Sequence, residues 1–275
     1  MFLLQKSFFL VYTGCRNCLT PNEEETAMRK AVFTVLMAGC TLLYAFTGFG
    51  AETEEADAGK ENEIALSALL GESPEWVTAL PEADTAAQML VVANYEGTTA
   101  WISMHEKDVD GIWQMIMTTP GFIGKAGLGK TKEGDAKTPV GTYGFNAAFG
   151  IAEDPGCAIP YTQVDDDTYW SGDVRDGMHY NEMVSIKDYP DLDTDSSEHI
   201  VHYIREYQYC LNIDYNKEGA PGKGSAIFLH CFGAFKPYTG GCIAIPENQM
   251  RCVMQHVQPD CVVIIDTLDN LGGSF

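Results

Sequence analysis

The chain has 275 residues, enough for one or two domains. Hydrophobic residues make up 45% and charged residues 20%, a globular balance that excludes wholesale disorder and collagen-like repetition. Acidic residues outnumber basic residues 39 to 17, and a formal net charge of -22 repels phosphate backbones, so we expect no nucleic-acid partner.

A basic and apolar segment, residues 28–50, precedes the acidic part of the chain. Arg29 and Lys30 are followed by the uncharged, mostly apolar stretch 31–50, which ends in small residues. This pattern predicts a secretory signal and therefore an exported protein. Two alternatives stay open: an uncleaved membrane tether through 31–50, since this length just spans a bilayer, and lipidation at Cys40 in a loose lipobox.

The segments on either side of this export signal are expected to lack a fold of their own. Residues 1–27 are interpreted as a mis-assigned start or an unstructured segment, and the pair Cys15 and Cys18 has no second ligand pair at zinc spacing. Residues 51–84 are acidic and poor in large apolar side chains, which predicts a solvated linker with one short helix at 62–70.

The folded domain is expected over residues 85–268, with strands as its main elements. Short apolar or alternating runs predict strands at 89–93, 98–105, 113–117, 138–145, 209–215, 225–231 and 261–266. The glycine-rich stretch 121–134 is expected to be a loop, and the acidic, aromatic stretch 150–195 an irregular insertion or lid. Together they predict one mainly-β domain, large enough to bury a proper core.

About two short helices complete the predicted domain. A capping-box pattern at Asp195 predicts one helix, whose buried face is formed by Ile200, Tyr203, Ile204 and Tyr207. Pro246 begins the second, whose buried side is formed by Met250, Val253, Met254 and Val257.

Two ligand-binding patterns occur in the sequence, and neither has the required context. Residues 124–131 satisfy the P-loop string, but no amphipathic helix follows Lys130 to aim its amides at a phosphate. Residues 191–202 begin like a calcium-binding loop, yet the sixth position is Ser196 and the twelfth is His202. We therefore expect neither nucleotide nor calcium binding.

The most informative segment is 223–246, which contains His230 and Cys242. An apolar strand delivers His230 at its end, and two glycines place Cys242 on a tight bend. A thiol needs a nearby base to become a nucleophile, and adjacent glycines free backbone amides to stabilise an oxyanion. Spacing alone equally allows a buried small cysteine and a core histidine.

A second motif accompanies this segment. Residues 239–243 read Thr-Gly-Gly-Cys-Ile with His230 upstream, and residues 138–143 read Thr-Pro-Val-Gly-Thr-Tyr. Over roughly residues 88–266 this resembles the L,D-transpeptidase (YkuD) catalytic domain family. The resemblance implies a β-sandwich-like domain with a groove, a monomer located in the cell wall or on the outer face of the membrane. It also implies transfer of peptidoglycan stem peptides without metal or organic cofactor.

Carried onto this chain, the resemblance assigns roles to the residues around the thiol. Cys242 would be the nucleophile, His230 the general base and acid, and the carbonyl of Cys231 would orient the imidazole. The oxyanion would be stabilised by the amides of Gly241 and Cys242, on a bend shaped by Thr239 and Gly240. An acceptor amine would then produce a 3–3 cross-link, whereas water would make the protein a carboxypeptidase.

The sequence departs from the family pattern near the substrate groove. Ala244 stands where members often carry arginine, so a substrate carboxylate needs another partner, for which the candidates are Lys236, Lys223 and Arg175. Other candidate groove residues are Tyr238, Tyr169, Trp170 and the segment 179–181. For the aromatic residues of the insertion, we favour packing over substrate contact.

Three further interpretations remain open at the level of sequence. The same fold could hydrolyse stems, or it could be a catalytically silent wall-binding module. A zinc site of His230, Cys231 and Cys242 is disfavoured because adjacent strand residues point to opposite faces. Disulfide pairing is also open. An odd number of cysteines remains beside Cys242, which leaves at least one free thiol if all pairing is internal; these cysteines are Cys157, Cys210, Cys231, Cys252 and Cys261.

Overall fold

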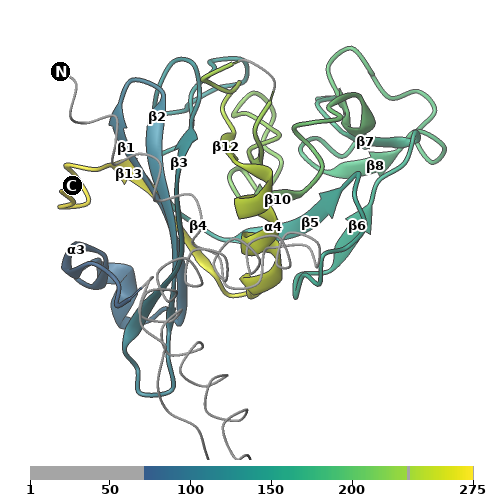
Figure 1. Ribbon diagram of the computed structural model, residues 1–275. Coiled ribbons are helices and arrows are strands. Elements are labelled where there is room, and N and C mark those ends of the chain that lie inside the picture. The colour runs from purple at the N-terminus through teal and green to yellow at the C-terminus, as the bar shows by residue number, and fades with distance from the viewer. Residues whose placement is uncertain (1–70, 234–235, 275) are drawn as a thin grey trace, which may run out of the picture.

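The computed structural model describes residues 71–233 and 236–274 (Figure 1). The expectations for residues 1–27, for the export segment 28–50 and for a helix at 62–70 lie outside these ranges. Within the described ranges, no helix has the length and apolar character needed to span a membrane.

A mixed ten-stranded sheet forms the body of the domain. From one edge to the other it consists of β4 (Gly141–Tyr143), β13 (Val262–Thr267), β1 (Gln88–Glu96), β2 (Thr99–Lys107), β3 (Trp113–Phe122), β12 (Ile243–Ile245), β11 (Phe228–Cys231), β10 (Cys210–Ile213), β5 (Phe145–Gly150) and β6 (Tyr161–Gln163). The pairs β1–β13, β11–β12 and β5–β6 are parallel, and the other neighbours are antiparallel.

The sheet curves so that its two halves share one hydrophobic core. Leu90 and Ile102 from β1 and β2 belong to the same buried cluster as Leu211 and Leu229 from β10 and β11. The helix α4 (Glu247–His256) contributes to this cluster and lies between the two halves (Figure 1). The predicted mainly-β, sandwich-like architecture is therefore confirmed.

The helix predicted from Pro246 is confirmed as α4. Pro246 occupies its N-cap position and Glu247 lies in its first turn, where a negative charge complements the helix dipole. Its predicted apolar stripe is fully buried, and it consists of Met250, Val253, Met254 and Val257. The predicted strands are present too, with β3 extending to Phe122 rather than ending at 117.

The prediction of a helix after Asp195 is wrong. Glu198 and His199 instead form the short strand β9 (Glu198–His199), and only one 3-10 turn follows, η3 (Ile200–His202). The hydroxyls of Ser196 and Ser197 donate to the carbonyl oxygen of Asp193, so neither serine caps a helix. Pairing with a distant strand has overridden the local helical pattern.

The insertion has its own small sheet. The strands β8 (Met183–Ser185), β7 (Thr168–Trp170) and β9 form a three-stranded antiparallel sheet beside the main one. Figure 1 shows β7 and β8 at the β5–β6 side of the molecule. The segment expected to be irregular is thus partly ordered into strands.

Structure begins earlier than the expected boundary at residue 85. The helix α3 (Glu75–Thr78) and the 3-10 turn η2 (Pro81–Asp84) bury Val77 and Leu80 against Met89 of β1. Residues 75–84, assigned to the linker from their composition, therefore cover one face of the sheet.

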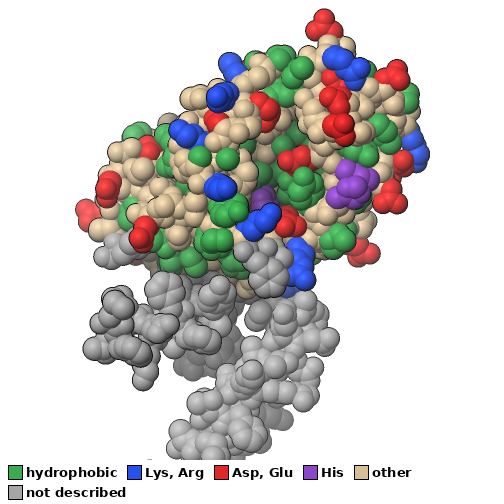
Figure 2. All heavy atoms as spheres, turned by 90° about the horizontal axis from the view of Figure 1, so that it is seen from above, with side chains coloured by type: hydrophobic (Ala, Val, Ile, Leu, Met, Phe, Trp, Pro, Cys, Tyr) green, Lys and Arg blue, Asp and Glu red, His purple; other side chains and the backbone are tan. Residues whose placement is uncertain are grey.

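Figure 2 shows acidic side chains scattered over one face of the molecule, with lysines and arginines between them.

Candidate active site

Cys242 follows a tight bend that is held by two threonine hydroxyls. Gly241 has a φ of +148°, a conformation that L side chains rarely adopt. The Thr239 hydroxyl accepts a hydrogen bond from the Gly241 amide at 3.1 Å and donates to the Cys242 carbonyl at 2.6 Å. The buried Thr138 hydroxyl donates to the Gly241 carbonyl at 2.7 Å. These bonds leave the backbone before the thiol little freedom.

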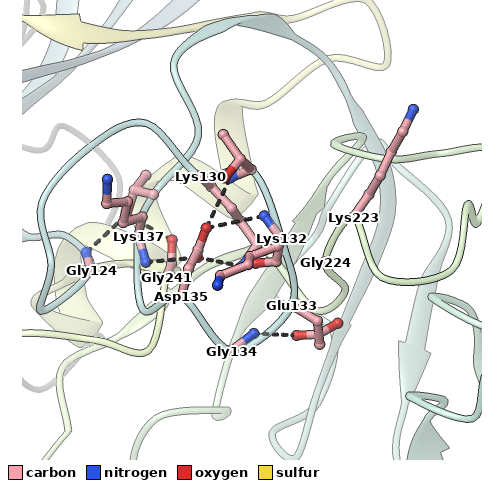
Figure 3. Close-up of polar contacts among 12 residues, drawn as sticks. Gly124, Lys130, Lys132, Glu133, Gly134, Asp135, Lys137, Lys223, Gly224 and Gly241 are labelled. Carbon is pink, nitrogen blue, oxygen red and sulfur yellow. Dashed lines mark hydrogen bonds and ion pairs between the residues drawn. The ribbon is translucent and has the colours of Figure 1, made fainter.

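Thr138 belongs to a loop that packs against this bend. Figure 3 shows Gly124 and Lys137 of this loop close to Gly241. The Thr138 hydroxyl also accepts from the Gly124 amide at 2.8 Å. Inside the loop, the buried Lys130 ammonium lies 3.1 Å from Asp135, whose carboxylate accepts backbone N–H groups as well. The P-loop-like string 124–131 is thus a loop that supports the bend, and Lys130 points inward to a carboxylate.

The Cys242 thiol is almost fully buried and neutral in this structure. Its Sγ donates to the Ala226 carbonyl at 3.1 Å and accepts from the Phe228 amide at 3.4 Å. Burial raises the pKa of the Cys242 thiol to about 12, and the nearby charge of Glu198 acts in the same direction. The thiol therefore needs a base at the moment of reaction.

His230 is the candidate for that base. Its Nδ1 lies 2.7 Å from the carbonyl oxygen of Cys231, which can only accept, so Nδ1 carries the proton and Nε2 has a free lone pair. Burial lowers the pKa of His230 to about 4, so the imidazole is neutral near pH 7. The Cys231 carbonyl occupies the orienting position expected from the sequence.

Strand register places His230 and Cys242 on the same side of the sheet. In the parallel pair β11–β12, Leu229 lies opposite Ile243 and His230 opposite Ala244. Because side chains alternate along a strand, His230 shares its face with Phe228, whose amide contacts the Cys242 sulfur.

The Cys231 side chain lies on the opposite face. It belongs to the main core, and its Sγ points to the Tyr209 carbonyl. This geometry contradicts the alternative of a zinc site made of His230, Cys231 and Cys242.

The contacts of Tyr207 with the imidazole and of Glu198 with Tyr207 are not identifiable from local sequence. The Tyr207 ring lies edge-on to His230, with 5.4 Å between ring centroids, and its hydroxyl donates to the Glu198 carboxylate at 2.5 Å. Burial raises the pKa of Glu198 to about 7. The sequence placed Tyr207 correctly on a buried face but within a helix that does not form. Nothing local indicated that β9 would carry a carboxylate to the site.

The aromatic residues predicted for the groove have different positions. Trp170 is buried, and its ring contacts Phe149 and Phe228. This agrees with the packing interpretation. Tyr169 stacks on His199 with 4.3 Å between ring centroids. Both residues belong to β7 and pack within the molecule.

The candidate partners for a substrate carboxylate are not brought together. Arg175 forms an ion pair with Asp173 at 2.5 Å inside the insertion. Lys223 is exposed and extends away from the loop of Lys130 (Figure 3). Lys236 is exposed on the segment before Thr239, and on the same segment the ring of Tyr238 lies 5.4 Å from the Lys125 ammonium.

The cysteines free in the structure include the candidate nucleophile. The described residues contain five free thiols: Cys157, Cys210, Cys231, Cys242 and Cys261. The expectation of at least one free thiol is therefore confirmed.

The chain resembles the helical cell shape determining protein Pgp2 from Campylobacter jejuni, with 18% identity and a TM-score of 0.36, over 66% of this chain and 48% of that one. It also resembles the Ldtfm-avibactam carbamoyl enzyme, with 13% identity and a TM-score of 0.31, over 66% and 49%. These likenesses are too distant to carry an argument, and the chain spans about half of each structure.

No curated protein matches the chain. A family model described as the L,D-transpeptidase catalytic domain, YkuD, matches residues 84–265, well over half of the chain. The chain therefore belongs to the YkuD family of L,D-transpeptidase catalytic domains.

Proposed function

We propose that this protein is an exported cysteine acyltransferase that acts on peptidoglycan stem peptides and forms 3–3 cross-links through a Cys242 thioester. Membership of the YkuD family supports the substrate class. The observation that supports the chemistry is that a buried Cys242 thiol and a neutral His230, protonated at Nδ1, lie on the same face of the sheet.

In the acylation half, the thiol must leave its contact with the Ala226 carbonyl. His230 Nε2 takes the thiol proton, and the sulfur attacks the carbonyl carbon of the third stem residue. The C–N bond to the terminal residue then breaks, and the imidazolium gives its proton to the leaving amine. A thioester on Cys242 and a free terminal amino acid are the products.

In the second half, an acceptor amine attacks the thioester and gives a proton to His230 Nε2. The C–S bond breaks, the sulfur recovers the proton from the imidazolium, and a new amide joins the two stems. Water in place of the amine would release a shortened stem instead. The chemistry of the protein is the same in both outcomes.

The oxyanion of each tetrahedral intermediate needs donors beside the sulfur. The Gly241 amide already donates to the Thr239 hydroxyl, so it is not free in this state. We therefore assign the oxyanion to the Cys242 amide, rather than to both amides as the family resemblance implied.

The test uses the full chain, a tetrapeptide-stem donor and an acceptor amine, with products identified by mass. We expect a cross-linked product that depends on the acceptor, a covalent carbapenem adduct on the wild-type protein, and neither with Cys242→Ala. Cys157→Ala removes another free thiol and is expected to retain both. Adduct formation on Cys242→Ala would contradict the assignment of the nucleophile. A shortened stem without cross-linking would favour the carboxypeptidase.

A further inference from the structure

The insertion takes no part in the mechanism above, yet one of its side chains reaches the backbone that surrounds the thiol. We propose that Asn181 is a positioning residue for Cys242, through which the insertion forms part of the nucleophile's pocket. The proposal rests on the proposed function, since it concerns how the same thiol is held for reaction.

The Asn181 side chain is buried and uses its full hydrogen-bonding capacity. Its Oδ1 accepts from the Trp170 indole at 3.0 Å and from the Ala226 amide at 2.9 Å. Its Nδ2 donates to the carbonyls of Tyr215 and Asn216 at 3.2 and 3.0 Å. Two acceptor and two donor sites are all that a primary amide offers, so the side chain has a single well-defined orientation.

Ala226 is the first link between Asn181 and the nucleophile. Its N–H is bonded to Asn181, and its carbonyl accepts the Cys242 thiol proton at 3.1 Å. Ala226 also has a φ of +54°, an uncommon conformation for a residue with a Cβ. Strained backbone persists only where the surroundings fix it, and Asn181 provides a hydrogen bond that does so.

Trp170 and Phe228 form a second link to the same sulfur. Asn181 fixes the Trp170 indole, whose ring lies edge-on to Phe228 with 4.8 Å between centroids. The Phe228 amide donates to Cys242 Sγ at 3.4 Å. Asn181 thus acts on both the acceptor and the donor that hold the thiol.

The local backbone explains why asparagine suits this position. Asn181 itself has a φ of +65°, a region that asparagine tolerates better than most residues. An aliphatic residue would bear the backbone strain without supplying the four hydrogen bonds. The backbone conformation and the four hydrogen bonds therefore both favour asparagine at position 181.

The decisive variant is Asn181→Ala in the full chain. Without Asn181 the Ala226 carbonyl is released, and the protonated thiol loses its acceptor, so its pKa falls. We expect iodoacetamide to alkylate Cys242 about threefold to tenfold faster at pH 8.5. We expect kcat for donor acylation to fall about tenfold or more with KM within about threefold, because the sulfur is no longer held in place.

A loss of stability alone would speed alkylation of another buried free thiol, Cys210, as well as that of Cys242, so faster alkylation confined to Cys242 distinguishes the positioning role. Trp170→Phe keeps an aromatic ring but removes the indole donor to Asn181, and it is expected to lower kcat for donor acylation about twofold to fivefold. It loosens the link to the Phe228 amide, a donor that lowers the pKa of the Cys242 thiol, so alkylation is expected to slow rather than to speed up. Tyr189→Phe removes a hydrogen bond to His179 within the insertion and is the matched control, expected to change neither rate.

Both assays are made at a temperature where circular dichroism shows each variant folded. Unchanged alkylation and unchanged kcat in Asn181→Ala and Trp170→Phe would overturn the proposal, as would equal effects from Tyr189→Phe. The alkylation readout needs no peptidoglycan, so a failure of the positioning role is distinguishable from a failure of the proposed function. The latter would appear as a wild-type protein that forms no acyl product.

Discussion

At the scale of single residues, the two glycines before the nucleophile differ sharply in what they tolerate. A Cβ on Gly241 would lie 2.9 Å from the Lys137 carbonyl oxygen, at a φ that already disfavours side chains. A Cβ on Gly240 would meet nothing within 4 Å.

These environments make Gly241→Ala and Gly240→Ala a matched pair. Gly241→Ala is expected to lower the free energy of unfolding by about 1–3 kcal/mol and to abolish most acyl transfer, because the bend must move. Gly240→Ala is expected to be near neutral in both. Urea unfolding and acylation assays measure the difference, and similar behaviour of the two variants would contradict this account of the bend.

The thiol and the imidazole are both neutral in the free protein, and this has a measurable consequence. With the Cys242 pKa near 12, each increase of one pH unit below that value raises the thiolate fraction about tenfold. Alkylation of Cys242 in the absence of substrate should therefore climb steadily from pH 7 to pH 10.

His230→Ala separates this resting reactivity from catalysis. It is expected to leave the alkylation profile nearly unchanged, since a neutral imidazole does not stabilise a thiolate, while acyl transfer is lost. Mass spectrometry of the alkylated protein gives the rates. A plateau near pH 7–8 in the wild type would instead indicate a thiolate–imidazolium pair.

At the scale of elements, the loop 124–138 and the bend before Cys242 behave as one unit joined by Thr138. Thr138→Val keeps the shape of the side chain but leaves the Gly124 amide and the Gly241 carbonyl without their shared partner. Unpaired buried groups cost about 1–3 kcal/mol, so we expect a loss of stability in that range together with slower acylation.

Thr142→Val is the control. Thr142 lies on the edge strand β4, and its hydroxyl donates to the Glu82 carboxylate in an exposed contact. It is expected to change stability by less than about 1 kcal/mol and activity not at all. Thermal unfolding with parallel activity assays provides the measurement. If Thr138→Val kept full activity, the bend would not depend on this loop.

The local sequence pattern predicted an element correctly where all the signals for that element lie within its own segment. Helix α4 carries its cap, its first-turn acid and its apolar stripe in one short segment, and β1 contains the continuous apolar run 89–93. The segment after Asp195 also carries a helical pattern, but Glu198 pairs with Trp170 across the insertion instead. That choice depends on contacts distant in sequence, which periodicity does not contain.

The same distinction applies to the candidate site. Cys242 and His230 stand out in the sequence because glycines and a strand end surround them. Asn181 was named only within the candidate groove segment 179–181, and Glu198 only within a helix that does not form, because both reach the site through the folding of the insertion. Sequence thus singled out the proposed reacting pair and left the roles of the residues around it undefined.

At the scale of the whole molecule, buried histidines make stability depend on pH. His105 is fully buried between the hydroxyls of Ser73 and Ser103, and burial lowers its pKa to about 4, as for His230. A depressed folded-state pKa contributes stability above the unfolded value of 6.5, and this stability is lost as pH falls towards 4. Each histidine contributes roughly 3 kcal/mol over that window.

Glu198 contributes to the pH dependence of stability in the opposite direction. Its pKa is raised from 4.5 to about 7, so its contribution is present below 4.5 and is lost as pH rises to 7. Two histidines outweigh one carboxyl group, and we expect net destabilisation on acidification from pH 7 to pH 4.

Replacing His105 tests this balance. His105→Gln is expected to flatten the decline in unfolding free energy between pH 6.5 and pH 4, whatever its effect on absolute stability, whereas the exposed His202→Gln should leave the slope unchanged. Urea titrations at half-unit pH steps measure both. Equal slopes for the wild type and His105→Gln would show that His105 does not contribute.

The long strand β3 determines where the domain can be attached. The Gly71 carbonyl accepts from the Met115 amide at the start of β3, whereas Phe122 at the other end pairs with Ala244, two residues after the thiol. Seven residue steps along the strand separate Met115 from Phe122 by roughly 23 Å at the usual rise per residue. Whatever precedes Gly71 joins the domain at the end remote from Cys242, so the point of attachment and the candidate active site lie at separate ends of the described domain. A surface or fusion partner joined before Gly71 would leave the reacting end facing outward.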